Sequence, residues 1–274
     1  IIPAMNAEMW NNSINQNNVK KLKKYGINFI GPERGHLSCG EIGLGRLSEP
    51  KKINTILIEN LKKTQIFKNK KCLITAGPTI EPIDSVRYLS NYSSGKQGYE
   101  IAKQMILAGA KVTLISGPTN LEPPFKSKLI KVKSAKDMLE AVIKNSKVDI
   151  AILTAAVSDM SPKKYFKTKI KKINFTNIGL KKNDDILKKI SSIKKNRPNI
   201  VVGFAAETSN HIKNAKDKLI QKKCDAIIVN KIDKNNQVFG SDMNKISIIT
   251  NKKIINLKKQ SKINVAKKII ELVS

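Results

Sequence analysis

Residues Lys71–Lys96, KCLITAGPTIEPIDSVRYLSNYSSGK, join an apolar run to a loop rich in Gly, Pro, Ser and Asn, and a helical pattern follows at Gly98–Ala110. The apolar residues Cys72–Ala76 predict a short buried strand. The loop then lies at the carboxyl end of a strand, the edge where parallel α/β sheets bind ligands. Residues 93–96, SSGK, open the helix, whose N-terminus favours an anion. No Walker or GxGxxG spacing is satisfied, so this pattern alone fits a phosphate or nucleotide loop and an ordinary surface loop equally well.

Beyond this loop, apolar runs alternate with helical patterns. The predicted strands are Cys72–Ala76, Lys111–Ser116, Ile150–Ala155, Ile200–Ala205 and Ala226–Asn230. The predicted helices are Gly98–Ala110, Ala135–Asn145, Ile186–Lys194 and Asn210–Lys223. This order predicts an α/β fold with a doubly wound, mostly parallel, Rossmann-like sheet and right-handed crossovers. A small C-terminal hairpin at Lys245–Thr250 and Lys253–Asn256 and a closing helix at Ser261–Leu272 are expected to complete it.

The first 50 residues are less regular. Two dense clusters, PAMNAEMW at Pro3–Trp10 and GHLSCGEIGLGRLSEP at Gly35–Pro50, flank a predicted short helix and strand within Asn18–Ile30. Ile53–Phe67 predicts an amphipathic helix, and a Lys-rich step follows it at Lys68–Lys71. We therefore expect two domains, residues 1–66 and residues 67–274.

The length and composition exclude several classes of protein. A chain of 274 residues can bury a full core, and it contains no run of 18 apolar residues that would predict a membrane span. The cysteines, Cys39, Cys72 and Cys224, are odd in number and far apart, so neither a disulfide framework nor a CxxC zinc site is expected. A reducing cytoplasm fits best. The chain begins with Ile, which suggests a processed or truncated beginning.

The net charge of +31 invites a nucleic-acid interpretation. Of the 52 basic residues, however, 48 are Lys and spread along the whole chain, and the four arginines are Arg34, Arg46, Arg87 and Arg197. Nucleic-acid readers usually concentrate Arg with aromatic residues. A solvated lysine surface is therefore favoured over a specific nucleic-acid site.

Each later strand ends in polar or aromatic side chains. Asp159 follows the third strand in AAVSDMSP, Phe204 and Glu207 belong to FAAETSN after the fourth, and Asn230 and Asp233 belong to NKID after the fifth. Because parallel strands end at one edge, we expect these loops to share a site. The alternatives are a helix or turn cap for Asp159 and a core position for Phe204.

Several single residues fit both a functional and a structural role. Lys169, in KIKK, and Lys218 and Lys222, at i and i+4 of a predicted helix, could clamp a triphosphate. In a chain with 48 lysines, however, the pattern favours the solvated lysine surface for each of them. Cys39 lies in a glycine-spaced segment suited to a flap that delivers a proton, although a lone cysteine is more often inert.

Together, these motifs resemble a known family. Residues 70–274 resemble phosphopantothenate-cysteine ligase, the second half of the bacterial bifunctional coenzyme A biosynthesis protein, and residues 1 to about 65 resemble the end of its first half, phosphopantothenoylcysteine decarboxylase. The ligase resemblance rests on ITAGPTIEPIDSVRYLSNYSSGK, AAVSDMSP, KIKK, KNDDIL, VVGFAAET and DAIIVN, which occur in the order and spacing of the family. The decarboxylase resemblance rests on PAMNAEMW and SCGEIGLGR.

The resemblance implies a CTP-dependent ligation with Mg²⁺ or Mn²⁺. The family activates the carboxylate of 4'-phosphopantothenate with CTP, forming an acyl-cytidylate and pyrophosphate, and the amine of L-cysteine then attacks to give the amide. A carboxylate is a poor acyl donor, so a metal ion and lysines that offset charge on the departing pyrophosphate suit the chemistry. The resemblance also implies a homodimer through the ligase domain, and it names no direct metal ligand.

Site residues follow from the matching positions. Asn91 matches the Asn that holds the acyl-cytidylate, and Lys169 matches the lysine of a mobile segment that closes over it. Further matches are nucleotide-binding positions: Ala155, Asp159, Phe204, Lys218 and Lys222, together with Asn183, Asp184, Asp185 and Ile186. The last four correspond to a stretch usually written NPDI. Asp184 stands in place of its Pro, which puts the stiffness of that turn in question.

In the decarboxylase half, Asn6 matches the substrate-binding Asn, and Cys39 matches the cysteine that protonates the enethiolate product. The FMN-binding strand and the histidine that the family uses should lie upstream of Ile1, and His36 and His211 do not match that motif. We therefore expect that this polypeptide alone neither binds FMN nor decarboxylates, whereas its parent gene product does.

Two other classes compete with the ligase interpretation. A nicotinamide-dependent Rossmann oxidoreductase would share the strand and helix order, but no GxGxxG follows Cys72–Ala76. A Lys-rich nucleic-acid-binding protein would share the charge. We expect neither a specific nucleic-acid partner nor a membrane partner.

Overall fold

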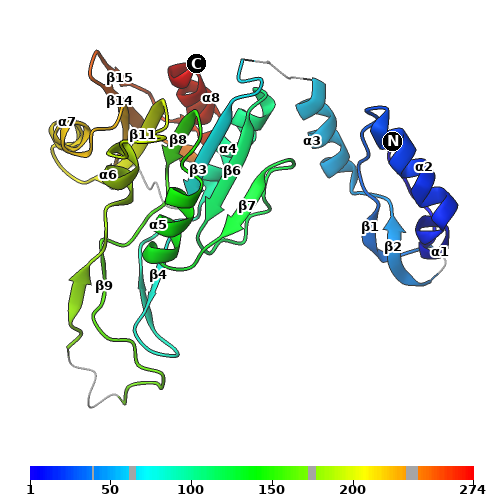
Figure 1. Cartoon of the computed structure of the whole chain (residues 1–274), viewed down its shortest axis with the longest axis horizontal. Coiled ribbons are helices and arrows are strands. Elements are labelled where there is room, and N and C mark those ends of the chain that lie inside the picture. Colours follow the sequence, from blue (N-terminus) through cyan, green and yellow to red (C-terminus); the bar gives the residue numbers. More distant parts are fainter. Residues whose placement is uncertain (39, 62–65, 172–176, 233–239) are drawn as a thin grey trace. The chain divides into compact units, whose positions relative to one another are not determined.

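The computed structural model describes residues 1–38, 40–61, 66–171, 177–232 and 240–274 (Figure 1). The chain divides into two compact units, Ile1–Lys63 and Thr64–Ser274. Within the described ranges, no helix has the length and apolar character needed to cross a bilayer.

An eight-stranded sheet forms the centre of the second unit (Figure 1). In spatial order its strands are β15 (Ile254–Asn256), β14 (Ile246–Thr250), β12 (Ala226–Lys231), β11 (Ile200–Glu207), β8 (Ile150–Leu153), β3 (Lys71–Ala76), β6 (Lys111–Ser116) and β7 (Lys128–Lys131). The strands from β12 to β7 are parallel, and β14 and β15 add antiparallel at one edge. The predicted doubly wound, mostly parallel sheet is confirmed. The C-terminal hairpin is a continuation of this sheet, because β14 pairs with β12.

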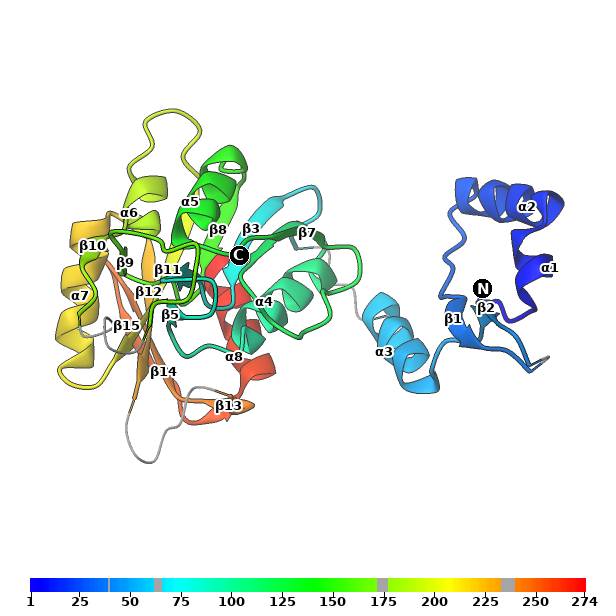
Figure 2. The same ribbon diagram turned by 90° about the horizontal axis from the view of Figure 1, so that it is seen from below.

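Helices cover both faces of the sheet (Figure 2). One face packs against α4 (Lys96–Leu107) and α8 (Lys262–Val273), and the other packs against α5 (Ala135–Lys144), α6 (Ile186–Ser191) and α7 (His211–Lys222). Neighbouring strand residues point to opposite faces, so Leu73 joins one core and Ile74 the other. This burial on both sides explains why the strands are continuous apolar runs in the sequence.

The chain changes direction at the middle of the sheet. It leaves β3 through α4 to reach β6 and β7 on one side, and it then returns through α5 to β8 on the other side of β3. The connections that leave the carboxyl ends of β3 and β8 therefore diverge. Such a switch point opens a crevice in which α/β proteins bind ligands.

Short ribbons complete the second unit. They are β4 (Ile80–Pro82) with β5 (Tyr88–Ser90), β9 (Met160–Pro162) with β10 (Leu180–Lys182), and β13 (Met243–Asn244) with β16 (Gln260–Ser261). The first of these hairpins lies inside the loop that follows β3. None of the ribbons was expected, because two or three residues show no periodicity and the side chains of β10 are all exposed.

The first unit differs from the sequence-based expectation. It contains α1 (Ala7–Asn11), α2 (Ser13–Lys24), β1 (Glu33–His36), β2 (Ile42–Arg46) and α3 (Pro50–Leu61). The strand expected before Ile30 is wrong, because α2 starts earlier and ends in a turn at Gly26 with φ +81°. The helix expected to reach Phe67 is also wrong at its end, because Phe67 is buried in the core of the second unit.

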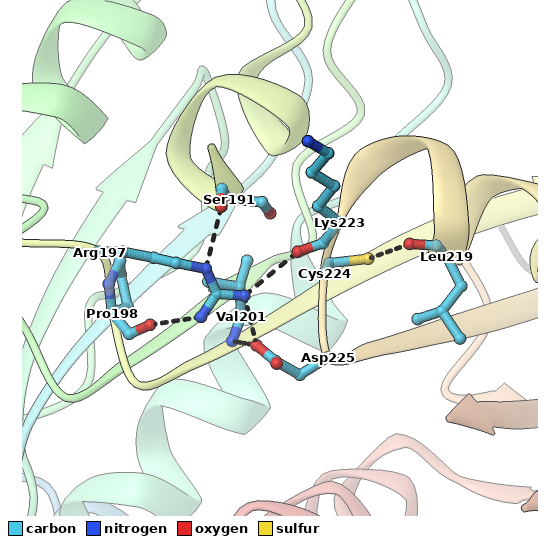
Figure 3. A network of polar contacts seen from close by, with 8 residues as sticks. All are labelled: Ser191, Arg197, Pro198, Val201, Leu219, Lys223, Cys224 and Asp225. Atoms are coloured by element: carbon cyan, nitrogen blue, oxygen red, sulfur yellow. Dashed lines mark hydrogen bonds and ion pairs between the residues drawn. The ribbon is translucent and has the colours of Figure 1, made fainter. Parts of the chain in front are cut away.

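A polar network ties the strands together at the amino edge of the sheet (Figure 3). The guanidinium of Arg197 donates to the backbone oxygens of Ser191, at 2.9 Å, and Lys223, at 3.2 Å, and it pairs with Asp225 at 2.9 Å. The Asp225 carboxylate also accepts the N–H of Val201 at 2.7 Å. The network fixes the starts of β11 and β12, so their carboxyl ends are held in register at the opposite edge.

Candidate functional site

A cavity of about 760 Å³ lies at the carboxyl edge of the main sheet. Its floor includes the strand ends Thr75, Leu153, Phe204 and Asn230. The loop before α4 and the loop after β8 form parts of its wall. The volume and the mixture of apolar and polar groups suit a ligand of nucleotide size.

The cavity brings together ten of the predicted site residues. They are Asn91, Ala155, Asp159, Asn183, Asp184, Asp185, Ile186, Phe204, Lys218 and Lys222. These residues come from three separate connections of the sheet and from the strand β11, and only folding places them side by side. Lys169 does not line the cavity and is exposed. Asp233 lies outside the described residues.

Asn91 joins two walls of the cavity. Its Nδ2 donates to the backbone oxygen of Val157 at 3.0 Å, which links the loop before α4 to the loop after β8. The neighbouring Ser90 Oγ donates to the backbone oxygen of Thr79 at 2.8 Å. The Asn91 side chain is therefore held at the switch point by Val157, and the Ser90 hydrogen bond fixes the backbone next to it.

The turn at residues 183–186 is fixed by hydrogen bonds. The Asn183 side-chain amide donates to Ser158 O at 2.9 Å, and the Asn183 N–H donates to Asp159 O at 2.9 Å. Asp185 caps α6 by accepting the N–H of Lys188 at 2.9 Å. These contacts hold the turn where the related motif carries Pro, so the stiffness of the turn does not depend on that residue.

The two lysines of α7 are already paired with carboxylates. Lys218 Nζ donates to Glu207 Oε1 at 2.6 Å, and Lys222 forms an ion pair with Asp185. Burial lowers the pKa of the Lys222 amine, and the nearby Asp159 carboxylate opposes this shift. Burial opposes ionisation of Glu207, but its hydrogen bonds from Lys218 and a neighbouring amide outweigh that effect and lower its pKa. Both lysines line the cavity.

A buried carboxylate anchors the segment that carries Lys169. Asp84 is 3% exposed, and it accepts the N–H groups of Val86 and Arg87 at 2.8 Å each and that of Ile170 at 3.2 Å. The Arg87 guanidinium binds both Asp84 and the Ile170 backbone oxygen. The chain beyond β9 extends away from the main sheet (Figure 1). Asp84, together with a backbone hydrogen bond from Phe166 N to Ile83 O at 3.0 Å, ties this segment to the loop between β4 and β5.

We expect Asp84→Asn to destabilise the second unit in a pH-dependent way. Burial opposes ionisation of Asp84, but the three N–H donors and Arg87 outweigh it and lower its pKa from 3.8 to about 2. The contribution of Asp84 to stability is therefore present above about pH 4 and is lost as the pH falls toward 2. Thermal unfolding at pH 7 and pH 2.5 checks this. The gap in Tm between wild type and Asp84→Asn should shrink at low pH, whereas a gap that is constant would contradict the assignment. Asp217→Asn, an exposed carboxylate on α7, is the matched control.

The first unit has a cavity of its own, of about 610 Å³, lined in part by Asn6, His36 and Arg46. Asn6 caps α1, since its Oδ1 accepts the N–H of Met9 at 2.7 Å. The carbonyl oxygen of the Asn6 side chain is thus engaged in a structural contact. Cys39 lies outside the described residues.

Other residues of interest were missed or misjudged by sequence reasoning. Lys262 and Asn244 line the main cavity, although neither was singled out. Lys262 is the first residue of α8, and no pattern separates it from the other lysines. Burial raises the pKa of the thiol of Cys72 and that of Cys224, the latter to about 11, so these two cysteines are structural.

Family models match both units. Residues 67–274 match the DNA/pantothenate metabolism flavoprotein C-terminal domain, and residues 1–62 match the flavoprotein family. The Coenzyme A biosynthesis bifunctional protein CoaBC of Borreliella burgdorferi is 44% identical over 274 residues, which cover 98% of this chain and 69% of that protein. That of Haemophilus influenzae is 42% identical, covering 97% of this chain and 66% of its own length. The chain therefore spans about two thirds of these relatives.

Solved structures agree with this match. The C-terminal domain of a Coenzyme A biosynthesis bifunctional protein CoaBC is 38% identical and superposes with a TM-score of 0.65, covering 76% of this chain and 96% of that one. The DNA/pantothenate metabolism flavoprotein of Streptococcus pneumoniae, at 22% identity and a TM-score of 0.64, covers 74% of this chain and 98% of its own and supports the fold.

The second unit is thus a Rossmann-like α/β protein with a ligand-sized cavity at its switch point. The chain belongs to the family of coenzyme A biosynthesis bifunctional proteins. This family match sets aside the competing interpretations as a nicotinamide-dependent oxidoreductase or a nucleic-acid-binding protein.

Proposed function

We propose that residues 67–274 form a ligase domain that joins L-cysteine to 4'-phosphopantothenate in a CTP-dependent reaction. The observation that carries this proposal is the convergence of ten motif residues, from three connections and the strand β11, in one cavity. The names of the relatives, which place them in coenzyme A biosynthesis, support the pathway. The choice of CTP rests on the motif resemblance.

The reaction has two steps. A carboxylate oxygen of the substrate attacks the α-phosphorus of CTP, the bond to the β-phosphate breaks, and pyrophosphate leaves. The amine of cysteine then attacks the acyl carbon, loses a proton, and CMP leaves with the bonding electrons. Lys218 and Lys222 offset phosphate charge, Phe204 contacts the cytosine, and the Asn91 amide orients the acyl-cytidylate. Groups aimed at developing charge in a cavity with little water stabilise such transition states effectively.

A divalent cation, Mg²⁺ or Mn²⁺, would neutralise charge on the pyrophosphate when bound. Over the described ranges, no group of three or more His, Cys, Asp and Glu residues could hold a metal ion by itself. Mg²⁺ is commonly bound by one or two carboxylates together with substrate phosphates. The cavity fits this mode, and Asp159 is the carboxylate we assign to it, because Asp184 and Asp185 already pair with lysines.

We propose for a protein as long as the relatives that the flavoprotein half decarboxylates the ligation product with FMN. The described part of the first unit does not itself fit FMN, because β1 and β2 pair only with each other, in an antiparallel ribbon, whereas doubly wound proteins bind FMN at the switch point of a parallel sheet. Asn6, at the cavity of this unit, is the residue we assign to substrate binding. The role of Cys39 and the homodimer through the ligase domain stay predictions.

Release of pyrophosphate from CTP tests the ligase proposal. We expect about one pyrophosphate per active site when the folded chain is mixed with CTP, Mg²⁺ and phosphopantothenate, because the acyl-cytidylate stays bound. Addition of cysteine should convert this burst to continuous turnover. ATP in place of CTP measures the nucleotide preference. A folded sample that releases no pyrophosphate under either condition would refute the proposal.

A further inference from the structure

Thr119 lies outside the main cavity, in the loop that follows β6. It contacts both ends of the long connection between β3 and α4, since Gly77 follows β3 and Gly95 directly precedes α4. Gly95 lines the cavity, whereas Thr119 and Gly77 do not. Thr119 therefore supports the wall of the cavity from behind.

The methyl group of Thr119 packs against both glycines. A Cβ atom added to Gly77 would lie 2.9 Å from Thr119 Cγ2, and a Cβ atom added to Gly95 would lie 2.8 Å from the same atom. Real Cβ atoms do not approach other heavy atoms this closely, so the methyl group occupies the space that a side chain at either position would need. Both glycines have φ 75°, a conformation that other residues rarely adopt. One methyl group thus fills the space between the two ends of the connection.

The hydroxyl group of Thr119 belongs to a chain of hydroxyl groups. Thr119 Oγ1 donates to the Tyr99 hydroxyl at 3.1 Å, and the Tyr99 hydroxyl donates to Ser116 Oγ at 3.1 Å. Ser116 Oγ donates in turn to the backbone oxygen of Gly117 at 2.8 Å. Tyr99 and Ser116 are both buried. The hydrogen bond to Tyr99 therefore holds the Thr119 side chain with its methyl group toward the two glycines.

The two glycines transmit this contact to the cavity. The backbone oxygen of Gly77 accepts the N–H of Ala156 at 2.9 Å, and Ala156 lines the cavity on the loop after β8. Gly95 ends the loop that contains Asn91, and Asn91 Nδ2 donates to the backbone oxygen of Val157 on the loop after β8. The positions of Gly77 and Gly95 therefore determine where Asn91 lies relative to the opposite wall.

We propose that Thr119 is a positioning residue for the ligation, which holds Asn91 at the reacting acyl group without contacting a substrate itself. The inference rests on the proposed function and deepens it. Loss of the methyl group leaves a gap beside two glycines, whose backbones have more freedom to move than those of other residues. Misplacing a catalytic group by about 1 Å can slow a reaction by about 100-fold. The methyl group of Thr119, rather than its hydroxyl group, is then the part that the reaction requires.

Two substitutions separate the two groups of Thr119. Thr119→Ser removes the methyl group and keeps the hydroxyl group, whereas Thr119→Val keeps the shape and removes the hydroxyl group. We expect Thr119→Ser to slow single-turnover amide formation by about tenfold and to leave the Kd of CTP within about twofold. Thr119→Val should form the amide at the wild-type rate. Thr113→Ser, the same change at a half-buried threonine earlier in β6, is the matched control.

A double variant shows whether the effect passes through Asn91. In an Asn91→Ala background, Thr119→Ser should slow amide formation no further, because residues that act as a unit are not additive. A merely structural role would instead give the same additional loss in both backgrounds. That result, or equal rates of amide formation in wild type and Thr119→Ser, would overturn the proposal.

Amide hydrogen exchange tests the positioning without turnover. The N–H groups of Ala156 and Tyr99 donate to the backbone oxygens of Gly77 and Gly95, so both should exchange several-fold faster in Thr119→Ser than in wild type. The N–H of Ile228, in the central strand β12, should exchange at an unchanged rate. If wild type releases no pyrophosphate, the proposed function fails, but this measurement still decides the role of Thr119. Unchanged exchange at Ala156 and Tyr99, or an equal increase at Ile228, would refute it.

Discussion

Lys169→Gln is expected to slow the release of pyrophosphate from CTP by about 100-fold or more while the fold stays intact. We propose that the segment of Lys169 closes over the cavity during activation, as the family resemblance implies. A cation placed in this way on charge that develops in the transition state typically accounts for about 10²–10³ in rate. Lys169 is exposed, and the next residue in the chain, Ile170, is anchored by the hydrogen bond from its N–H group to Asp84. Its removal costs no core packing, so the loss should be confined to the activation step. Burst kinetics of pyrophosphate release measure that step directly.

The control is Lys167→Gln, an exposed lysine on the same segment. It carries the same change of charge two residues away and should release pyrophosphate at the wild-type rate. If both substitutions slow pyrophosphate release equally, the effect comes from the loss of positive charge on the segment and not from a specific role of Lys169. If Lys169→Gln keeps wild-type activity, Lys169 returns to the class of solvated surface lysines.

Asn91→Ala is expected to separate binding from chemistry. Lys218 and Lys222 on α7, together with Phe204, are the groups we assign to CTP, so the Kd of CTP should change by less than about twofold. Amide formation should slow by about 10-fold to 100-fold, because a hydrogen bond to a charged or reacting group is worth about 1.5–3 kcal/mol. Single-turnover mixing of the preformed acyl-cytidylate with cysteine gives this rate, and calorimetry gives the Kd.

Asn91 also bonds to Val157, so its removal could loosen the loop. A thermal unfolding curve distinguishes this effect, since a loosened loop lowers Tm or weakens CTP binding as well. Asn120→Ala, an exposed Asn of the same unit outside the cavity, is the matched control. Wild-type rates of amide formation in Asn91→Ala would remove Asn91 from the proposed mechanism.

The central strands could be predicted because burial on both faces of the sheet requires an unbroken run of apolar residues, which is visible in the sequence. Ile150–Leu153 reads IAIL and is entirely buried, so apolar residues at every position are required. The helix of Ala135–Lys144 could be predicted from a different pattern, because it buries one face and its apolar residues repeat at helical spacing. The strand-end residues then followed from topology, since parallel strands deliver their loops to one edge.

The remaining features lack such a signal. The strand β10 contains two lysines and is exposed, so its pairing with β9 depends on tertiary contacts. Lys262 looks like any other of the 48 lysines, and only its burial at the start of α8 distinguishes it. The role of Asp84 was also hidden, because a carboxylate in a Pro-containing loop resembles a turn residue until the chain brings Ile170 to it.

The paired lysines of α7 have a consequence for selectivity. Glu207 and Asp185 are tethered beside Lys218 and Lys222, so each acts as an internal ligand at an effective concentration on the order of millimolar or higher. A simple anion has to outcompete that local carboxylate at one lysine, whereas a polyphosphate engages both lysines at once. We therefore expect the cavity to bind a polyphosphate in preference to a simple anion. Once pyrophosphate has left and the cysteine amine has displaced CMP, the carboxylates pair with the lysines again, which helps CMP to depart.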